Sequence, residues 1–297
     1  MKKIYKLTNK FKYYEWGSLS FIPDFLGIAK DEKTPYAEMW MGTHRCAPSM
    51  IEENEKLINL EDKYGELPFL FKLIAVDSPL SIQVHPNEKQ AIEGFQREEK
   101  KELQADDPKR CYKDRNKKNE IICALTPFTL LAGLKEECNA EIYSPHHLNL
   151  ITLQPGQAVF IPCGIPHTYI KGFGMELMNS SDNVIRGGLT NKYIDLIEFK
   201  KIINHHPYLP QIITPDSESY FNYPLSEICD DFSLSMIHSD GKNLSLNQKN
   251  PAICLVTDGK LNIDNHCFKK GDSFYIENDY NELRLEGKFT LYMASFG

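Results

Sequence analysis

Two histidines, a glutamine and a glutamate stand where their side chains could share one metal ion. Gln83 and His85 lie in LSIQVHP, whose alternation predicts a strand. Side chains two residues apart on a strand share a face and lie about 7 Å apart along the chain. Glu120 opens a second apolar segment, EIICAL, and His167 follows QAVFIPCGIP. The pattern predicts a metal site with the ligands Gln83, His85, Glu120 and His167.

Two imidazoles, one carboxylate and one amide oxygen make a mixed nitrogen and oxygen donor set. This set suits zinc better than calcium, which takes oxygen ligands, or a soft metal, which favours sulfur. A coordination position left open to water or to a substrate distinguishes catalytic zinc from structural zinc. We therefore expect Zn2+ as the cofactor.

Each of these residues also has a plainer interpretation when it is taken alone. His85 could simply end a strand before Pro86, and Gln83 could be a surface amide. The joint occurrence of the four favours a metal site. The remaining histidines have no comparable context and are expected to be surface or structural residues: His44, His146, His147, His205, His206, His238 and His266.

The elements that must position these residues are mainly strands. Short β-branched and aromatic segments, separated by Gly, Pro, Asn and Asp, dominate from Leu148 onward and are typical of a sandwich or jelly roll. Two helices are expected. One begins after Asn87, an N-cap with Gln90 at the capping-box position, and the other spans about 192–204.

An internal repeat indicates two related β-barrels. Residues 148–170 have a weaker echo in residues 261–283, and each copy has a glycine (Gly156, Gly271) directly before its second strand. Only the first copy keeps a histidine beyond that strand, so the second copy looks structural. We expect a catalytic domain with the zinc site at 1–200 and a C-terminal jelly roll without a metal site at 201–297.

Composition excludes several classes of partner. The 297 residues carry a net charge of −7 and no basic stripe, which argues against nucleic-acid binding. No apolar segment approaches the ~20 residues of a membrane span, and the N-terminus has no apolar core typical of a secretory signal. Eight cysteines without a CxxC pair favour reduced thiols. We expect a cytoplasmic protein without a membrane partner.

Four segments resemble type I mannose-6-phosphate isomerases, a zinc-dependent family of the double-cupin fold. They are YEWGS at 14–18, AEMWMGTHRCAPS at 37–49, LPFLFKLIAVDSPLSIQVHPNEKQAIEGF at 67–95 and GMELMNSSDNVIRGGLTNK at 174–192. The spacing of Gly156, Pro162, Gly164 and His167 is also similar to that of the second cupin motif. The resemblance implies a double-cupin fold of two jelly-roll barrels, the same four zinc ligands and a monomer.

The sequence departs from the family in two places. The family motif HKPE reads KKNE here, so Lys117 replaces its histidine and Asn119 its proline, while Lys118 and Glu120 are kept. Longer members carry an inserted helical domain, but only about fifteen residues separate Leu131 from His147 here. That domain is therefore expected to be missing.

The resemblance implies an isomerase acting on mannose 6-phosphate and fructose 6-phosphate, which moves a proton between C1 and C2 through an enediol. It makes Arg186 catalytic, and the planar guanidinium suits an enediolate or a phosphate. Base candidates are Lys118, because a nearby dication favours its neutral amine, then Glu176 and, less favoured, Glu38.

Three further residues are expected to contact the sugar phosphate substrate: Ser81, Lys72 and Trp16. Ser81 shares the face of Gln83, and a tryptophan can stack on a sugar ring. Two alternatives stay open: a free-mannose isomerase that needs no phosphate, and a non-catalytic sugar-sensing cupin. Turnover on mannose and on mannose 6-phosphate distinguishes them.

Overall fold

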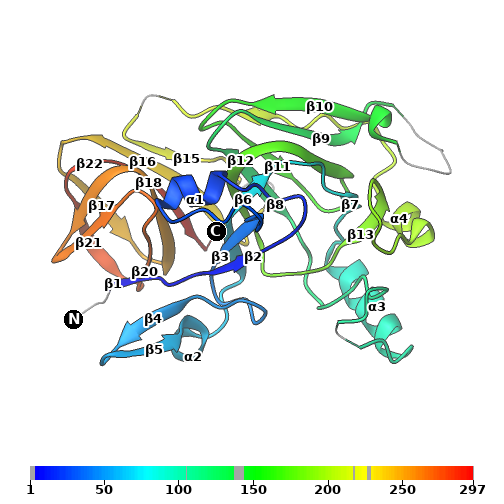
Figure 1. Cartoon of the computed structure of the whole chain (residues 1–297), viewed down its shortest axis with the longest axis horizontal. Helices are drawn as coiled ribbons and strands as arrows, with labels where there is room; N and C mark the ends of the chain where they lie inside the picture. Colours follow the sequence, from blue (N-terminus) through cyan, green and yellow to red (C-terminus); the bar gives the residue numbers. More distant parts are fainter. Residues whose placement is uncertain (1–3, 105, 137–143, 217, 226–228, 297) are drawn as a thin grey trace. The chain divides into compact units, whose positions relative to one another are not determined.

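Figure 1 shows the chain as a computed structural model, which describes residues 4–104, 106–136, 144–216, 218–225 and 229–296. Within these residues strands far outnumber helices, so the predicted mainly β fold is confirmed. None of the helices in the described ranges is both long and apolar enough to span a membrane. The cysteines there are free thiols, as predicted, whereas Cys138 lies outside the described residues.

Contacts group the chain into two compact units. One holds residues 74–214, and the other joins residues 1–73 with residues 215–297. The predicted division at residue 200 follows chain order and so differs from these units. It stays a prediction about where the catalytic part of the chain ends.

The unit of residues 74–214 contains every predicted metal ligand. Its elements are β7 (Ile82–Val84), α3 (Glu88–Glu99), β8 (Glu120–Ala124), β9 (Phe128–Leu134), a 3-10 turn (Pro145–His147), β10 (Leu148–Leu153), β11 (Ala158–Ile161), β12 (His167–Asn179), β13 (Ile185–Gly188), α4 (Leu196–Ile202) and β14 (Ile212–Ile213).

The long strand β12 joins two sheets of this unit. Its first residues pair with β9 and β7, in the order β10-β9-β12-β7-β13, and its last residues pair with β8, in the order β14-β11-β8-β12. All these pairings are antiparallel. Figure 1 shows β9, β10 and β12 as neighbouring green strands.

A bend in β12 brings its two ends to the same site. His167 begins the strand, and Met178 near its end lies opposite Glu120. A straight strand would separate those two positions on β12 by ~36 Å at about 3.3 Å per residue. A register shift between Tyr169 and Lys171 and the glycine at 172 (φ +140°) bend it instead, as at a barrel corner.

Both predicted helices are present. Asn87 caps α3 through a hydrogen bond from the Gln90 N–H, and the Gln90 side chain accepts from the Asn87 N–H, so the predicted capping box is confirmed. α4 begins later than predicted, after Asp195, whose side chain accepts from the Glu198 N–H. Figure 1 shows α4 beside β7 and β13, and the buried Phe199 of α4 packs with Ile82 in one apolar cluster.

The other unit is built mostly from antiparallel strands. Its elements are β1 (Ile4–Lys6), β2 (Lys10–Lys12), α1 (Phe21–Leu26), β3 (Glu38–Met41), β4 (Met50–Glu53), β5 (Lys56–Asn59), α2 (Leu60–Tyr64), β6 (Phe69–Val76, which begins in this unit), β15 (Tyr220–Asn222), β16 (Ser233–Asp240), β17 (Leu244–Gln248), β18 (Ala252–Ile263), β19 (His266–Lys269), β20 (Ser273–Ile276), β21 (Tyr280–Leu285) and β22 (Lys288–Ser295). Its main sheet has the order β1-β20-β18-β22-β16-β15.

The internal repeat reappears as matching turns. Gly156 before β11 has φ +85°, and Gly271 before β20 has φ +89°. This left-handed backbone region strongly favours glycine, which explains why both copies keep the residue. The two segments therefore share a local turn and a following strand.

Candidate metal centre and active site

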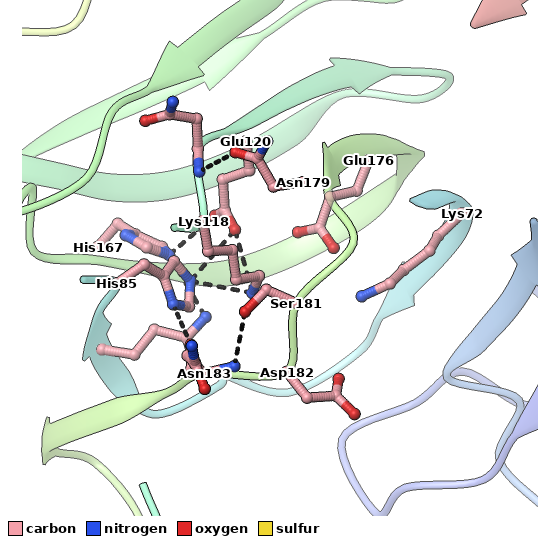
Figure 2. A network of polar contacts seen from close by, with 12 residues as sticks. Lys72, His85, Lys118, Glu120, His167, Glu176, Asn179, Ser181, Asp182 and Asn183 are labelled. Atoms are coloured by element: carbon pink, nitrogen blue, oxygen red, sulfur yellow. Dashed lines mark hydrogen bonds and ion pairs between the residues drawn. The ribbon is translucent and has the colours of Figure 1, made fainter. Parts of the chain in front are cut away.

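Three of the four predicted ligands converge on one point inside the unit of residues 74–214. His167 Nε2 lies 2.9 Å from Glu120 Oε1, and His85 Nε2 lies 3.2 Å from Glu120 Oε2. One ligand atom from each residue lies within 4.8 Å of the others. All three residues are buried, and Figure 2 shows their side chains pointing toward one another.

The sheet register places the fourth predicted ligand beside them. Gln83 in β7 lies opposite His167 of β12 on one side and opposite Arg186 of β13 on the other. Directly opposed residues of antiparallel strands project to the same face. Gln83 Nε2 lies 3.3 Å from His167 Nε2, and a 180° rotation of the amide would put its oxygen on that side.

Backbone carbonyls fix the orientation of both imidazoles. His85 Nδ1 lies 2.8 Å from the carbonyl oxygen of Asn183, and His167 Nδ1 lies 2.9 Å from that of Ile165. Because a carbonyl oxygen only accepts, each Nδ1 carries the proton and donates it. Each Nε2 therefore faces the site as the nitrogen available to a metal.

The ionisation states also suit a metal. Burial and then the positive charge of Lys118 lower the pKa of His85 to about 3, so the imidazole is neutral at pH 7. Burial alone would raise the pKa of Glu120, but His167, Lys118 and His85 together hold it well below its usual value. A neutral imidazole at His85 and an ionised carboxylate at Glu120 are forms that bind metal ions.

One oxygen of Glu120 also suits a bound zinc ion. Glu120 Oε2 is fully buried and accepts no hydrogen bond from any described residue. His85 Nε2 lies 3.2 Å from it and Lys118 Nζ lies 3.4 Å from it. The ion pair with Lys118 offsets part of the cost of burying this oxygen, and a bound metal ion would give it a closer partner. Zinc accepts a donor set of two imidazole nitrogens and one carboxylate oxygen, which His85, His167 and Glu120 provide here.

Lys118 lies directly against these ligand atoms. Its Nζ is 3.1 Å from His85 Nε2 and 3.4 Å from Glu120 Oε2, and the side chain is buried. The backbone N–H of Lys118 also donates to the carbonyl of Pro86, which follows His85. The structure thus brings this predicted base to the metal ligands.

Glu176 is connected to the site through Tyr169, a residue that the sequence reasoning missed. The Tyr169 hydroxyl lies 2.9 Å from Glu176 Oε1 and 3.0 Å from Glu120 Oε1. Burial, followed by these two carboxylates, raises the pKa of Tyr169 well above its usual value, so the hydroxyl stays protonated. A signal was present, since Tyr169 lies two residues after His167 and a buried tyrosine needs a hydrogen-bond partner.

Arg186 is half-buried on the face that carries Gln83, beside the metal ligands. The two glycines that follow it, Gly187 and Gly188, belong to β13 and not to a turn. Gly187 is instead required by packing: a Cβ there would lie 2.7 Å from the Phe199 ring of α4. Close contact between β13 and α4 therefore sets the position of Arg186.

Asn183 is a second residue that the sequence reasoning missed. Its side chain donates to the carbonyls of Asp114 (3.1 Å) and Asn116 (2.9 Å) and accepts from the Lys113 N–H (2.7 Å). Its own carbonyl orients His85. Nothing in the sequence distinguishes such a buried asparagine from a surface one, because its partners are backbone groups in a distant segment.

The predicted substrate contacts fall in different units. Ser81 is half-buried directly before β7, in the unit that holds the metal ligands. Lys72 and Trp16 belong to the other unit. There Lys72 Nζ lies 3.6 Å from Glu38 Oε1, and Trp16 stacks on Tyr14 with 5.4 Å between ring centroids. Contact of these three residues with substrate stays a prediction.

Fold and site together define a mainly β, cupin-like protein with a buried His–Glu–His cluster that could hold a metal ion. Residues 4–137 match the family described as phosphomannose isomerase type I, catalytic domain. The mannose-6-phosphate isomerase of Salmonella typhimurium is 29% identical over 95% of this chain and 97% of its own, and that of Escherichia coli is 26% identical over the same shares.

Solved structures agree with this match. A zinc-bound mannose 6-phosphate isomerase superposes with a TM-score of 0.88 at 26% identity, and the match covers 99% of each chain. A second one, bound with zinc and yttrium, gives a TM-score of 0.87 at 27% identity. The chain is therefore similar to type I phosphomannose isomerases along most of its length and shares the cupin-like fold of the solved mannose 6-phosphate isomerases.

The chain is shorter than its alignment with the Salmonella typhimurium relative. This alignment spans 378 positions, which is more than the 297 residues of this chain. The relative therefore carries segments that have no counterpart here. This agrees with the expected absence of the inserted helical domain.

Proposed function

We propose that the protein is a zinc-dependent isomerase that interconverts mannose 6-phosphate and fructose 6-phosphate through an enediol. The observation that carries the proposal is the convergence of His85 Nε2, His167 Nε2 and a Glu120 carboxylate oxygen within 4.8 Å of one another. The relatives that match over most of both chains are named mannose-6-phosphate isomerases.

Four residues would hold the ion: Gln83, His85, Glu120 and His167. Zinc, when bound, supplies a Lewis acid that stabilises negative charge developing on sugar oxygens. With Glu120 as the single anionic ligand, the centre keeps a net positive charge. Both histidine rings are held by their Nδ1–H bonds to backbone carbonyls, so the site is preorganised.

Proton transfer between C1 and C2 needs a base beside the reacting carbons. Lys118 Nζ is the strongest candidate, because it lies against the ligand atoms of His85 and Glu120 in a buried site. Glu176 is the second candidate. The Tyr169 hydroxyl holds its carboxylate by a hydrogen bond, and the same hydroxyl touches Glu120.

Arg186 is proposed to stabilise the negative charge that develops on the substrate. Its guanidinium is always protonated and offers a planar set of donors, which suits an enediolate or a phosphate. Its place opposite Gln83 supports this role. Ser81, Lys72 and Trp16 are proposed to contact the sugar phosphate. A monomeric state and a cytoplasmic location stay predictions from the sequence.

A coupled assay tests the proposal. Purified protein is given mannose 6-phosphate or mannose, and formation of the ketose is followed. Turnover on mannose 6-phosphate and none on mannose at equal concentration is the expected result. Equal turnover on both sugars would indicate a free-mannose isomerase. Binding of zinc and sugar phosphate without turnover of either would identify a sugar-sensing cupin and refute the assignment.

A further inference from the structure

We propose that Asn119 is a positioning residue that ties the three metal-ligand segments to one turn and thereby sets the affinity of the site for zinc. The inference rests on the proposed metal centre. Asn119 does not belong to the ligand set itself. It is buried beside Glu120, and it occupies the position where the resemblance led us to expect a proline.

Three hydrogen bonds link Asn119 to Asn179 and Cys163. The Asn119 backbone N–H donates to Asn179 Oδ1 (2.9 Å), and its carbonyl accepts from the Asn179 N–H (3.1 Å). Its side-chain Oδ1 accepts from the Cys163 N–H (3.0 Å). Figure 2 shows Asn179 near Glu120, the residue that follows Asn119. These bonds join the start of β8 both to the end of β12 and to the turn of residues 162–166.

That turn contacts the other two ligand segments. The Gly164 N–H donates to the carbonyl of His85 (2.9 Å), and the Ile165 carbonyl accepts from His167 Nδ1 (2.9 Å). Glu120 follows Asn119 directly in the chain. The turn held by Asn119 therefore contacts the backbone of His85 and the ring of His167, while Asn119 links it to the glutamate.

Proline could not make two of these bonds. It lacks a backbone N–H, so it could not donate to Asn179, and it has no side-chain oxygen to accept from Cys163. The departure from the family motif thus adds two connections around the metal ligands. Groups that orient metal ligands typically change metal affinity by about 10- to 100-fold when they are removed.

The experiment measures zinc affinity of the metal-free protein by competition with a chromophoric chelator, together with thermal unfolding. Asn119→Ala removes Oδ1 and keeps the backbone N–H. We expect it to weaken zinc binding by about 10-fold or more. Asn119→Asp keeps an acceptor at the same place and is expected to bind zinc within about threefold of the unmodified protein, or more tightly.

Asn9→Ala is the matched control. Asn9 is a part-buried asparagine whose side chain bonds Ser49 and Ser273 in the other unit. The control is expected to lower the unfolding temperature and to leave zinc affinity unchanged. The absorption spectrum of the Co2+-loaded protein gives a second readout, because it reports the coordination geometry. It should change in Asn119→Ala alone.

The possible results separate the two proposals. If the unmodified protein binds zinc and Asn119→Ala binds it equally well with an unchanged Co2+ spectrum, the positioning role is refuted and the metal centre stands. If the unmodified protein binds no zinc, both proposals fail. Should Asn119→Ala not fold, Asn179→Ala is measured instead, since it removes the acceptor of the Asn119 N–H. Unchanged zinc affinity in that variant would refute the role.

Discussion

Lys118 Nζ lies 3.1 Å from His85 Nε2, so the ammonium donates a hydrogen bond to the lone pair that a metal would use. The other ring nitrogen, Nδ1, is occupied by its bond to the Asn183 carbonyl. On this ring, Nε2 is therefore the nitrogen that remains available to Lys118. A group bound between these ligands would come within reach of the lysine, which is the requirement for a base in the isomerisation.

Replacement of this lysine is the first prediction. Lys118→Met should retain zinc and lower kcat by about 10²- to 10⁴-fold, because the proton-transfer group is lost while every metal ligand remains. Lys117→Met is the matched control, since it removes the neighbouring, less buried ammonium. Loss of only a few-fold, with the basic limb of the pH profile unchanged, would exclude Lys118 as the base.

Acid should destabilise the metal-free protein through His85. Because burial lowers its folded pKa to about 3, the unfolded chain binds a proton between about pH 6.5 and 3 that the folded chain does not. The contribution of His85 to the free energy of unfolding is fully present above pH 6.5 and is lost as the pH falls. The expected loss between pH 7 and pH 5 is about 2 kcal/mol. The lowered pKa of Glu120 adds to the loss at lower pH.

Urea unfolding at pH 7 and pH 5 measures this effect. His85→Gln should be less stable at pH 7 but should show a smaller difference between the two pH values. His205→Gln removes an exposed histidine and is the control, with the pH difference expected to stay as in the unmodified protein. An equal pH difference in His85→Gln and the unmodified protein would contradict the buried, neutral state of His85.

Tyr169→Phe tests the bridge between the two carboxylates. Without the hydroxyl, Glu120 Oε1 and Glu176 Oε1 both lose a buried partner. We expect zinc affinity to fall by about 10-fold and stability to fall by about 1–3 kcal/mol. Tyr220→Phe removes a hydroxyl that contacts Ser235 in the other unit and should leave zinc affinity unchanged. Unchanged zinc binding in Tyr169→Phe would show that the hydroxyl does not orient Glu120.

Local patterns predicted the parts of the site that depend on local geometry. The capping box of Asn87 and the shared face of Gln83 and His85 follow from spacing along the chain. The pairing of Gln83 with both His167 and Arg186 does not, because it depends on strands far apart in the sequence. The bend of β12, which brings its two ends to the same site, is likewise set by tertiary packing.

Arg186→Lys tests the charge assignment. Lysine keeps the positive charge but loses the planar set of donors, so kcat/KM for mannose 6-phosphate should fall by about 10²- to 10³-fold. Arg115→Lys, a change at an exposed arginine, is the control and should have little effect. Steady-state kinetics measures kcat/KM for both variants. A value for Arg186→Lys close to that of the control would contradict the assignment.

The metal content of the purified protein, measured together with formation of fructose 6-phosphate before and after chelation, tests the central claim most directly. The account predicts zinc in equimolar amount with the chain, loss of isomerase activity when a strong chelator removes it, and recovery when zinc is restored. Isomerase activity that persists in protein freed of metal would contradict the account.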